Sequence, residues 1–261
     1  MVSIPPSLVR RVDRSSIVNP VERSGTMFLV FHDRPSDSPL IERVWRCHSE
    51  RAGTFLSVAA THCELVLTRH RGRVRVTLRG PETRPTSIRC PSDAEWLGIR
   101  LATGSFFPHH PAASLMNRQD VDLPATARGF RLDGSAWEYP SFDNAEALVE
   151  RLSRGGLLAR DPAVAAALTG DWKALSRRTV QRHFLLATGM THRTWRQIQR
   201  ARHAALLLCS GASIADVVHQ AGYYDQPHLT RSLERRLGTT PGRIQRREQQ
   251  LSFLYKTALA A

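Results

Sequence analysis

The pattern of apolar and polar positions changes character once along this chain, near residue 141. Before that point, apolar residues fall in short runs of about four to eight positions separated by glycine and proline, which is typical of β-strands. We expect six strands, over residues 27–32, 41–48, 55–60, 63–69, 74–79 and 95–101. In the fifth run, Val74, Val76 and Leu78 alternate with arginine and threonine, which predicts one buried face and one wet face.

After the strands, the spacing of the apolar positions becomes helical. Residues 108–140 show no clear period and are expected to be irregular. Residues 143–158 then have helical spacing and end at Gly155–Gly156, which indicates a helical connector. From residue 161 onward the pattern is helical up to a short tail. The predicted fold class is therefore α+β, with an N-terminal small β-barrel or sandwich and a C-terminal all-α domain.

This division predicts four parts of the chain. They are a β domain over residues 1–140, a connector over 141–160, a helical domain over 161–248 and a tail over 249–261. Residues 1–25 are punctuated by proline, serine and arginine, and we interpret them as a loosely held arm of the β domain. The tail carries apolar side chains that could pack back as a short helix, namely Leu251, Leu254, Tyr255 and Leu259.

The stretch from Ile214 to Arg247 contains a helix-turn-helix pattern. Its first eight residues place apolar side chains at helical spacing, and Gly222 then gives the backbone the freedom that a tight turn needs. Asp225 can cap a second helix, and Gly238 can end it. One side of that helix carries Leu229, Leu233, Arg236 and Leu237, and the opposite side carries Pro227, Thr230, Arg231 and Glu234. A short helix, a glycine turn and a helix with a polar side are the parts of a helix-turn-helix motif.

A similar pattern precedes it in the chain. Val164–Leu168 predicts a helix that Thr169–Gly170 interrupts, and Ser176 is a suitable N-cap for the helix that follows. In that helix, Val180 and Phe184 share one side. The side facing away carries Arg178, Arg182 and Leu185, with Gln181 at its edge. The seven-residue turn ahead of Ser176 is longer than this motif usually has.

One continuous helix is expected to join the two motifs. Thr194–Leu208 has a single stripe of small and apolar residues, made of Ile198, Ala201, Ala205 and Leu208. About 15 residues at about 1.5 Å each give a rod of roughly 22 Å. With a small helical bundle at each end, such a rod can set two recognition helices near one DNA turn apart, about 34 Å. One chain could then read two successive major grooves.

The residues A-G-Y-Y-D-Q-P-H-L-T-R, followed by L-G-T-T-P, resemble the second helix-turn-helix of the AraC/XylS family of transcription regulators. The joining helix is similar to the linker helix of that family, whose R-x-x-x-A-x-x-L pattern appears as Arg200, Ala204 and Leu207. The strand-rich half resembles the N-terminal domain of one branch of these regulators, in P-L-I-E-R-V-W, C-E-L-V-L and G-I-R-L-A-T-G. The resemblance implies a sequence-specific DNA-binding regulator whose β domain has a regulatory, effector-binding or dimerisation role.

The resemblance also implies which side chains contact DNA. They are Arg178, Gln181 and Arg182 in the first motif, and Gln226, His228, Thr230 and Arg231 in the second. Arginine can bridge guanine O6 and N7, and glutamine can bridge adenine N6 and N7, each worth about 1–3 kcal/mol of discrimination. The chemistry therefore suits that role independently. We expect a further group of arginines to meet phosphates or solvent: Arg235, Arg236, Arg243, Arg246 and Arg247.

The charge balance favours a polyanionic partner. The chain has 37 Lys and Arg against 23 Asp and Glu, a net charge of +14. Residues 141–261 hold +9 of this charge, from 18 basic and 9 acidic residues. A localised basic excess is typical of nucleic-acid binding, although arginine-rich coding alone would produce part of it. The expected partner is double-stranded DNA, and RNA polymerase, a small-molecule effector and a second copy of the chain stay open as further partners.

The cysteines and the apolar runs bear on where the protein works. Cys47, Cys63, Cys90 and Cys209 are far apart and include no C-x-x-C pair, which favours free thiols in a reducing cytoplasm. No apolar run reaches the roughly 18–20 residues that a membrane span needs. The N-terminus lacks the apolar core of a signal peptide. We therefore expect a cytoplasmic protein without a membrane partner.

A metal- or redox-responsive sensor and a cupin-type enzyme are the alternatives for the N-terminal half. His62–Cys63, Cys47–His48 and His109–His110 could supply metal ligands, but neighbours on a strand point to opposite faces. A redox role would need exposed thiols of low pKa. The cupin H-x-H…E spacing and the common catalytic motifs are absent from the sequence, so we expect no catalytic residue, metal or cofactor. Glu64 lies within a strand and is expected to face solvent unless it serves a pocket.

Overall fold

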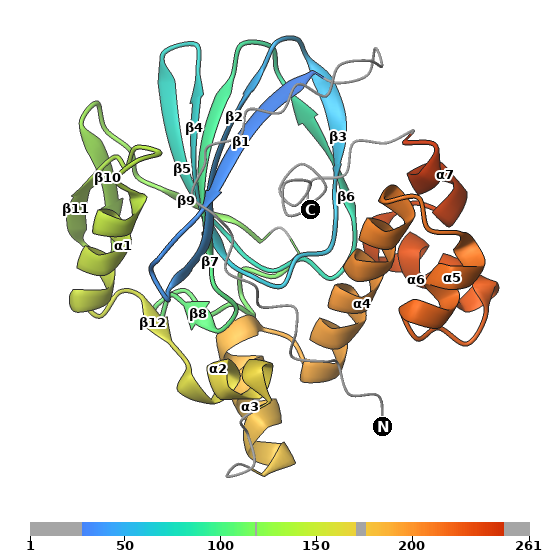
Figure 1. Cartoon of the computed structure of the whole chain (residues 1–261). Helices are drawn as coiled ribbons and strands as arrows, with labels where there is room; N and C mark the ends of the chain where they lie inside the picture. Colours follow the sequence, from blue (N-terminus) through green and yellow to red (C-terminus); the bar gives the residue numbers. More distant parts are fainter. Residues whose placement is uncertain (1–27, 118, 171–175, 248–261) are drawn as a thin grey trace.

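Figure 1 shows the computed structural model of the chain, which describes residues 28–117, 119–170 and 176–247. The expected N-terminal arm, the expected C-terminal tail and most of the turn ahead of Ser176 lie outside these residues. The described part has a strand-rich N-terminal half and a helical C-terminal half, as the sequence predicts.

The β domain is built on an antiparallel sheet of six strands in the order β1-β2-β7-β4-β5-β9. The strands are β1 (Leu29–Pro35), β2 (Ile41–Ser49), β7 (Glu95–Leu101), β4 (Glu64–His70), β5 (Arg73–Arg79) and β9 (Val121–Leu123). All of these except β9 coincide with strands predicted from the apolar runs. In β5, Val76 and Leu78 are buried and Arg75 is exposed, as expected. Thr77 on the expected wet face is also buried, at the position where β5 pairs with Asp122 of β9, and its hydroxyl donates a 2.8 Å hydrogen bond to that carboxylate.

A second layer covers one end of this sheet. It is a two-stranded ribbon of β3 (Gly53–Ser57), which was predicted, and β6 (Thr86–Cys90), which was not. Phe55 and Ile88 of the ribbon pack against Phe28 and Leu29 at the sheet edge. Within the described residues, the two edge strands of the sheet are not hydrogen-bonded to each other. The sheet is therefore not a closed barrel, and the two layers are compatible with the sandwich that was the other predicted form.

Residues 108–140 are more regular than the sequence suggested. They contain β9 and a hairpin of β10 (Gly129–Leu132) and β11 (Ser135–Glu138). The hairpin turn is Asp133–Gly134, where φ is 48° and 82°. Two successive positive φ values match the twist of a tight hairpin, and Asp-Gly is a favoured pair there. The expectation of an irregular segment was wrong for these three strands, because strands of three or four residues are too short to show a period.

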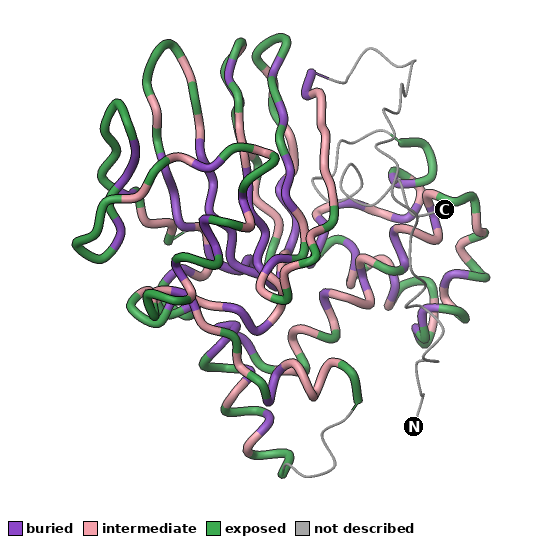
Figure 2. Tube along the Cα trace, turned by 60° about the vertical axis from the view of Figure 1, so that its left-hand side comes forward, coloured by how far each residue is buried: buried purple, intermediate pink, exposed green. Residues whose placement is uncertain are grey.

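The helical connector packs as part of the β domain. α1 (Ala145–Arg154) buries Ala145, Leu148, Val149 and Leu152 in the main core of that domain. Figure 1 shows α1 beside β10 and β11. Directly after α1, β12 (Ala159–Arg160) pairs with β8 (Ser105–Phe106). Figure 2 shows that the strand segments nearest the helices are buried, whereas the hairpin tips far from them are exposed.

Six helices make up the described helical half. They are α2 (Pro162–Thr169), α3 (Arg177–Thr188), α4 (His192–Cys209), α5 (Ile214–Gln220), α6 (Gln226–Leu237) and α7 (Pro241–Gln245). The pairs α2–α3 and α5–α6 are the two predicted helix pairs, and α4 is the predicted joining helix. Its expected stripe is at most 1% exposed, at Ile198, Ala201, Ala205 and Leu208. Figure 1 shows α2 and α3 at one end of α4, and α5, α6 and α7 at the other.

The β domain and the helical half share apolar clusters. Val58, which follows β3, is buried in the same cluster as Leu229 and Leu233 of α6. Ala59 lies in a different cluster, with Met190 and Ile198. The segment after β3 therefore packs against both α4 and α6, and the two halves form a continuous structure.

Glu64 in β4 is buried, so the expectation that it faces solvent was wrong. Arg100 Nε donates a hydrogen bond to Glu64 Oε1 at 3.1 Å, and Trp45 Nε1 donates one to the same oxygen at 3.4 Å. His62 Nε2 lies 3.3 Å from that oxygen as well. Burial, and then the charge of Arg100, lowers the pKa of His62 to about 4. Glu64 thus belongs to a polar cluster inside the β domain, in which the imidazole is neutral near pH 7.

Candidate nucleic-acid interface

α3 begins where the sequence predicts. Ser176 Oγ accepts a backbone hydrogen bond at 3.1 Å and so caps the first turn. Gly189 ends the helix with a φ of 67°, in the left-handed region that favours glycine. Val180 and Phe184 are buried in a small core with Val164 of α2. This packing leaves the opposite side of α3 facing outward.

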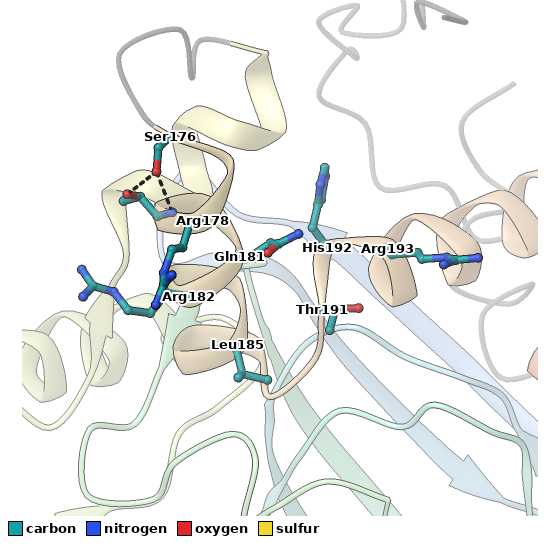
Figure 3. A pocket seen from close by; sticks show the side chains of 9 residues that line it. Ser176, Arg178, Gln181, Arg182, Leu185, Thr191, His192 and Arg193 are labelled. Atoms are coloured by element: carbon teal, nitrogen blue, oxygen red, sulfur yellow. Dashed lines mark hydrogen bonds between the residues drawn. The ribbon is translucent and has the colours of Figure 1, made fainter.

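The outward side of α3 borders an open hollow, which we call the α3 hollow (Figure 3). It is lined by Ser176, Arg178, Thr179, Gln181, Arg182, Leu185, Thr191, His192 and Arg193. The three residues of this motif that were expected to contact DNA are exposed and line it together. In Figure 3, Gln181 points towards His192, whereas Arg182 extends to one side of the hollow. Leu185 is 50% exposed there, and offers an apolar surface to a partner.

The second motif is held by the local signals that the sequence carries. Gly222 forms the turn between α5 and α6 with a φ of 67°. The Asp225 carboxylate caps α6 by accepting a 2.7 Å hydrogen bond from the backbone nitrogen of His228. Gly238 ends α6 with a φ of 69°. The leucine side of α6 is fully buried, at Leu229, Leu233 and Leu237.

The opposite side of α6 borders a second hollow, which we call the α6 hollow. It is lined by Gln226, Pro227, Thr230 and Arg231. Three of the four residues expected to contact DNA in this motif are therefore together. His228 is not among them, because its ring packs edge-on against Tyr223 with a centroid distance of 5.2 Å. Its Nδ1 also accepts a 3.4 Å hydrogen bond from the backbone nitrogen of Tyr224.

The arginines near the end of α6 have different surroundings. Arg235 in α6 and Arg243 in α7 are exposed and lie outside both hollows. Arg236 was expected to meet phosphates or solvent, and this was wrong, because it is only 6% exposed. Its Nη1 donates a 2.8 Å hydrogen bond to the carbonyl of Thr83, and its Nη2 donates a 2.7 Å bond to Gln197 Oε1. Arg236 therefore has a structural role between the two halves of the chain.

Arg200 joins the linker helix to the second motif. Its guanidinium lies 4.4 Å from the ring centroid of Tyr223, which is a cation–π contact. Its Nη1 donates a 3.3 Å hydrogen bond to the carbonyl of Gly222. These two contacts hold the turn before α6 against α4.

The helical patterns did not indicate three residues of the α3 hollow. Thr191, His192 and Arg193 belong to the turn after α3 and the start of α4. The His192 ring stacks on Trp195 at 5.9 Å and lies 4.7 Å from the ring of Phe184. Burial, and then the charge of Arg196, lowers the pKa of His192. No periodic signal in a single helix could have found these residues, because they meet α3 only in three dimensions.

Two observations bear on the alternatives of a metal or redox sensor. Among the residues that the structure describes, no group of three or more His, Cys, Asp or Glu side chains could hold a metal ion. Burial raises the pKa of the Cys63 thiol to about 12 and that of Cys90 to about 11. Such thiols are poor nucleophiles near neutral pH, which argues against redox chemistry at these two positions.

In the described ranges, every helix is too short or too polar to cross a lipid bilayer.

The pairs α2–α3 and α5–α6, each with a second helix that has one buried and one outward side, have the arrangement of helix-turn-helix motifs, and a comparison with known proteins gives the same class of domain. Residues 173–247 match a family described as a helix-turn-helix domain, of the AraC type. Proteins similar to this chain are named as an HTH-type transcriptional regulator and as a regulatory protein. The resemblance to AraC/XylS regulators that the sequence carries is thereby confirmed for this domain.

Three relatives show the extent of the similarity. The chain is 41% identical over 69 residues to the HTH-type transcriptional regulator RipA of Corynebacterium glutamicum, which covers 26% of this chain and 21% of that protein. It is 30% identical over 117 residues to the regulatory protein Ada of Salmonella typhimurium, which covers 43% of this chain and 33% of that protein. It is 29% identical over 102 residues to the bifunctional transcriptional activator/DNA repair enzyme Ada of Escherichia coli, which covers 39% of this chain and 29% of that protein. The chain spans between about a fifth and a third of these relatives, and no solved structure matches it.

Proposed function

We propose that this protein is a sequence-specific DNA-binding transcription regulator in which α3 and α6 are the two recognition helices. The observation that carries the proposal is that the outward sides of both helices line open hollows, while their opposite sides are buried in separate cores. Helices held in this way can present several side chains to base edges without moving. No catalytic role is part of the proposal.

The side chains in the two hollows suit base recognition. Arg178, Arg182 and Arg231 can each bridge two acceptors of guanine in the major groove, and Gln181 and Gln226 can each bridge adenine. Thr230 and the exposed Leu185 offer apolar contacts to thymine methyl groups. The α3 hollow has three arginines and the α6 hollow has one, so the two motifs contribute differently to affinity.

The length of α4 supports the proposal that the two helices enter adjacent major grooves. Its 18 residues exceed the predicted span by three residues. At about 1.5 Å for each residue, the helix is roughly 27 Å long. Because a helical pair packs at each end, the two recognition helices can reach the separation of about 34 Å that one DNA turn requires.

We further propose that the β domain regulates the DNA-binding half, through a small-molecule effector or self-association. The support is the shared packing of Val58 with the core of α6, and the bond from Gln199 in α4 to Thr61, at 3.3 Å. A change in the β domain would therefore act on the linker helix and on α6 directly.

The proposal is tested with the full chain and a pool of random duplexes. Selection of bound sequences followed by footprinting should yield one enriched site with two protected patches about one turn apart on the same DNA face. If the protein binds DNA but enriches no sequence, it is a basic protein that coats DNA, and the proposed sequence specificity is wrong. A single protected patch would show that only one of the two helices reads DNA.

A further inference from the structure

We propose that Arg193, at the start of α4, binds the DNA backbone beside α3. Together with Thr191 and His192 it forms one side of the α3 hollow, which we call the α4 side. The inference rests on the proposed DNA-binding function and adds a contact that neither helix-turn-helix pattern indicates. It assigns the base-reading and the backbone-binding parts of the α3 hollow to two different helices.

The α3 hollow is built from two chain segments that meet at the Gly189 turn. α3 and its cap supply six of the lining residues, and the start of α4 supplies Thr191, His192 and Arg193. In Figure 3, Arg182 extends to one side of the hollow and Arg193 extends to the other, with Gln181 and His192 between them. A ligand that fills the hollow would therefore have a guanidinium group on each side.

The charges of the hollow favour a polyanion. Its lining includes three arginines and one histidine and no acidic residue. Within the described part of the chain, no ion pair or hydrogen bond occupies the guanidinium groups of Arg178, Arg182 and Arg193. A ligand with regularly spaced negative charges would be attracted to these three positive charges. The phosphates of a duplex have that arrangement.

The α4 side of the hollow is held in place before DNA binds. The His192 ring is stacked on Trp195 with an interplanar angle of 21°, and Phe184 of α3 lies against it. Thr191 caps α4 by accepting a 3.1 Å hydrogen bond from the backbone of Thr194. These contacts fix the first turn of α4 against α3, so little ordering is needed for Arg193 to meet a phosphate.

The place of Arg193 beside the recognition helix decides which part of DNA it meets. When a recognition helix lies in the major groove, elements at its flank face the phosphates along the groove edge. Arg193 is therefore a backbone contact that fixes the register of the first motif and carries no base preference. The α6 hollow has only Arg231, so most of the salt-dependent affinity of the two hollows comes from the first motif.

The chain offers a matched control for the test. Arg196 lies one turn further along α4 and is exposed, but it does not line the hollow. Arg193→Ala and Arg196→Ala each remove one positive charge from the same helix. Arg193→Lys retains the charge at the proposed contact and shows whether a loss comes from the charge or from altered packing.

The probe is a fluorescent random-sequence duplex of about 30 base pairs, roughly three helical turns. Binding of the full-length protein is measured by anisotropy from about 50 to about 200 mM salt, and Arg193→Ala should lower the slope of log affinity against log salt by about 0.9. Between about 50 and about 200 mM salt, the affinity of the unaltered protein should therefore fall by a factor about three to four times larger than the affinity of Arg193→Ala. Arg196→Ala and Arg193→Lys should retain the original slope.

Two outcomes would overturn the inference in distinguishable ways. If the unaltered protein binds the duplex and Arg193→Ala has the same slope as Arg196→Ala, Arg193 is not a backbone contact, and the proposed function stands. If the unaltered protein does not bind duplex DNA at any salt concentration tested, the proposed function fails and the inference fails with it.

Discussion

The guanidinium group of Arg236 in α6 donates a 2.8 Å hydrogen bond to the backbone carbonyl of Thr83 in the β domain. The same side chain donates a 2.7 Å bond to Gln197 of α4. The backbone carbonyl of Arg236 in turn accepts a 2.9 Å bond from the nitrogen of Ala59. One buried arginine thus joins α6, α4 and the β domain.

We expect Arg236→Ala to lower the free energy of unfolding by about 1–3 kcal/mol, because it leaves the acceptors of Thr83 and Gln197 without their donor. Arg235→Ala removes the same charge from the neighbouring exposed position and should change stability by less than about 0.5 kcal/mol. Urea unfolding of the two variants, followed by circular dichroism, measures the difference. Equal and small losses would contradict a structural role for Arg236.

The buried cluster around Glu64 leads to a second prediction. Glu64→Gln keeps the size of the side chain but removes the charge that faces Arg100 at 3.1 Å. Breaking a buried ion pair from one side typically costs about 3–5 kcal/mol. Arg100 Nη1 keeps Glu42 as a partner at 3.6 Å, so the loss should lie at or below the lower end of that range. Glu95→Gln, on an exposed position of the neighbouring strand β7, is the control and should have almost no effect. A loss in Glu64→Gln no larger than that of the control would contradict a stabilising role for this pair and show that Glu42 alone compensates the charge of Arg100.

His62 should make the protein less stable as the pH falls. Burial, and then Arg100, lowers its pKa in the folded protein from 6.5 to about 4. Between these values the unfolded chain takes up a proton that the folded chain does not, so acid favours unfolding by up to about 1.4 kcal/mol for each pH unit. Above the unfolded pKa this effect is absent.

The measurement is the slope of the unfolding free energy against pH from about 5 to about 6.5. His62→Gln removes the titrating group and should flatten this slope, whereas His48→Gln, at an exposed position of β2, should not. An unchanged slope in His62→Gln would mean that the ring takes up its proton equally well in the folded state.

The sequence predicts the helical half in detail because its signals are local. Ser176 and Asp225 cap the helices that follow them, and Gly238 ends α6, since each acts on residues within one turn. The same holds for the buried sides of α3 and α6, which depend only on helical spacing. The Asp133–Gly134 hairpin is also a local signal, but the lack of a period around it concealed the two strands.

The contacts between distant segments could not be predicted in this way. Arg236 falls on the same side of α6 as Leu233 and Leu237, which is the correct face, but its charge suggested solvent. Its acceptor at Thr83 is 153 residues away, and no spacing rule connects the two. Arg193 could not be predicted for a related reason, because it comes to line the α3 hollow only when α4 folds against α3.

The shared packing also affects the helical half when it is isolated. A fragment of residues 161–248 retains both hollows, and we expect it to bind DNA. It loses Val58 and Leu56, which pack on the core of α6, so that helix should be less protected. Hydrogen exchange at the amides of Leu229 and Leu233 should be faster in the fragment than in the full chain. Equal exchange rates would show that the β domain adds nothing to the stability of α6.

The recognition helices should differ from the C-terminal arginines in what they read. Arg182 and Arg231 line the two hollows, whereas Arg243 is exposed in α7 and outside them. Arg182→Ala or Arg231→Ala should therefore cost about 1–3 kcal/mol on the selected site and much less on random DNA. Arg243→Ala should weaken binding to both DNAs alike and lower the salt slope by about one unit.

Competition titrations with the selected and the random duplex, at several salt concentrations, separate these effects. A loss confined to the selected site shows a base contact, because only base contacts depend on sequence. A loss shared by both duplexes shows a phosphate contact. If Arg182→Ala and Arg231→Ala lose equally on the two duplexes, their guanidinium groups meet the backbone, and base reading must come from neighbours such as Gln181 and Gln226.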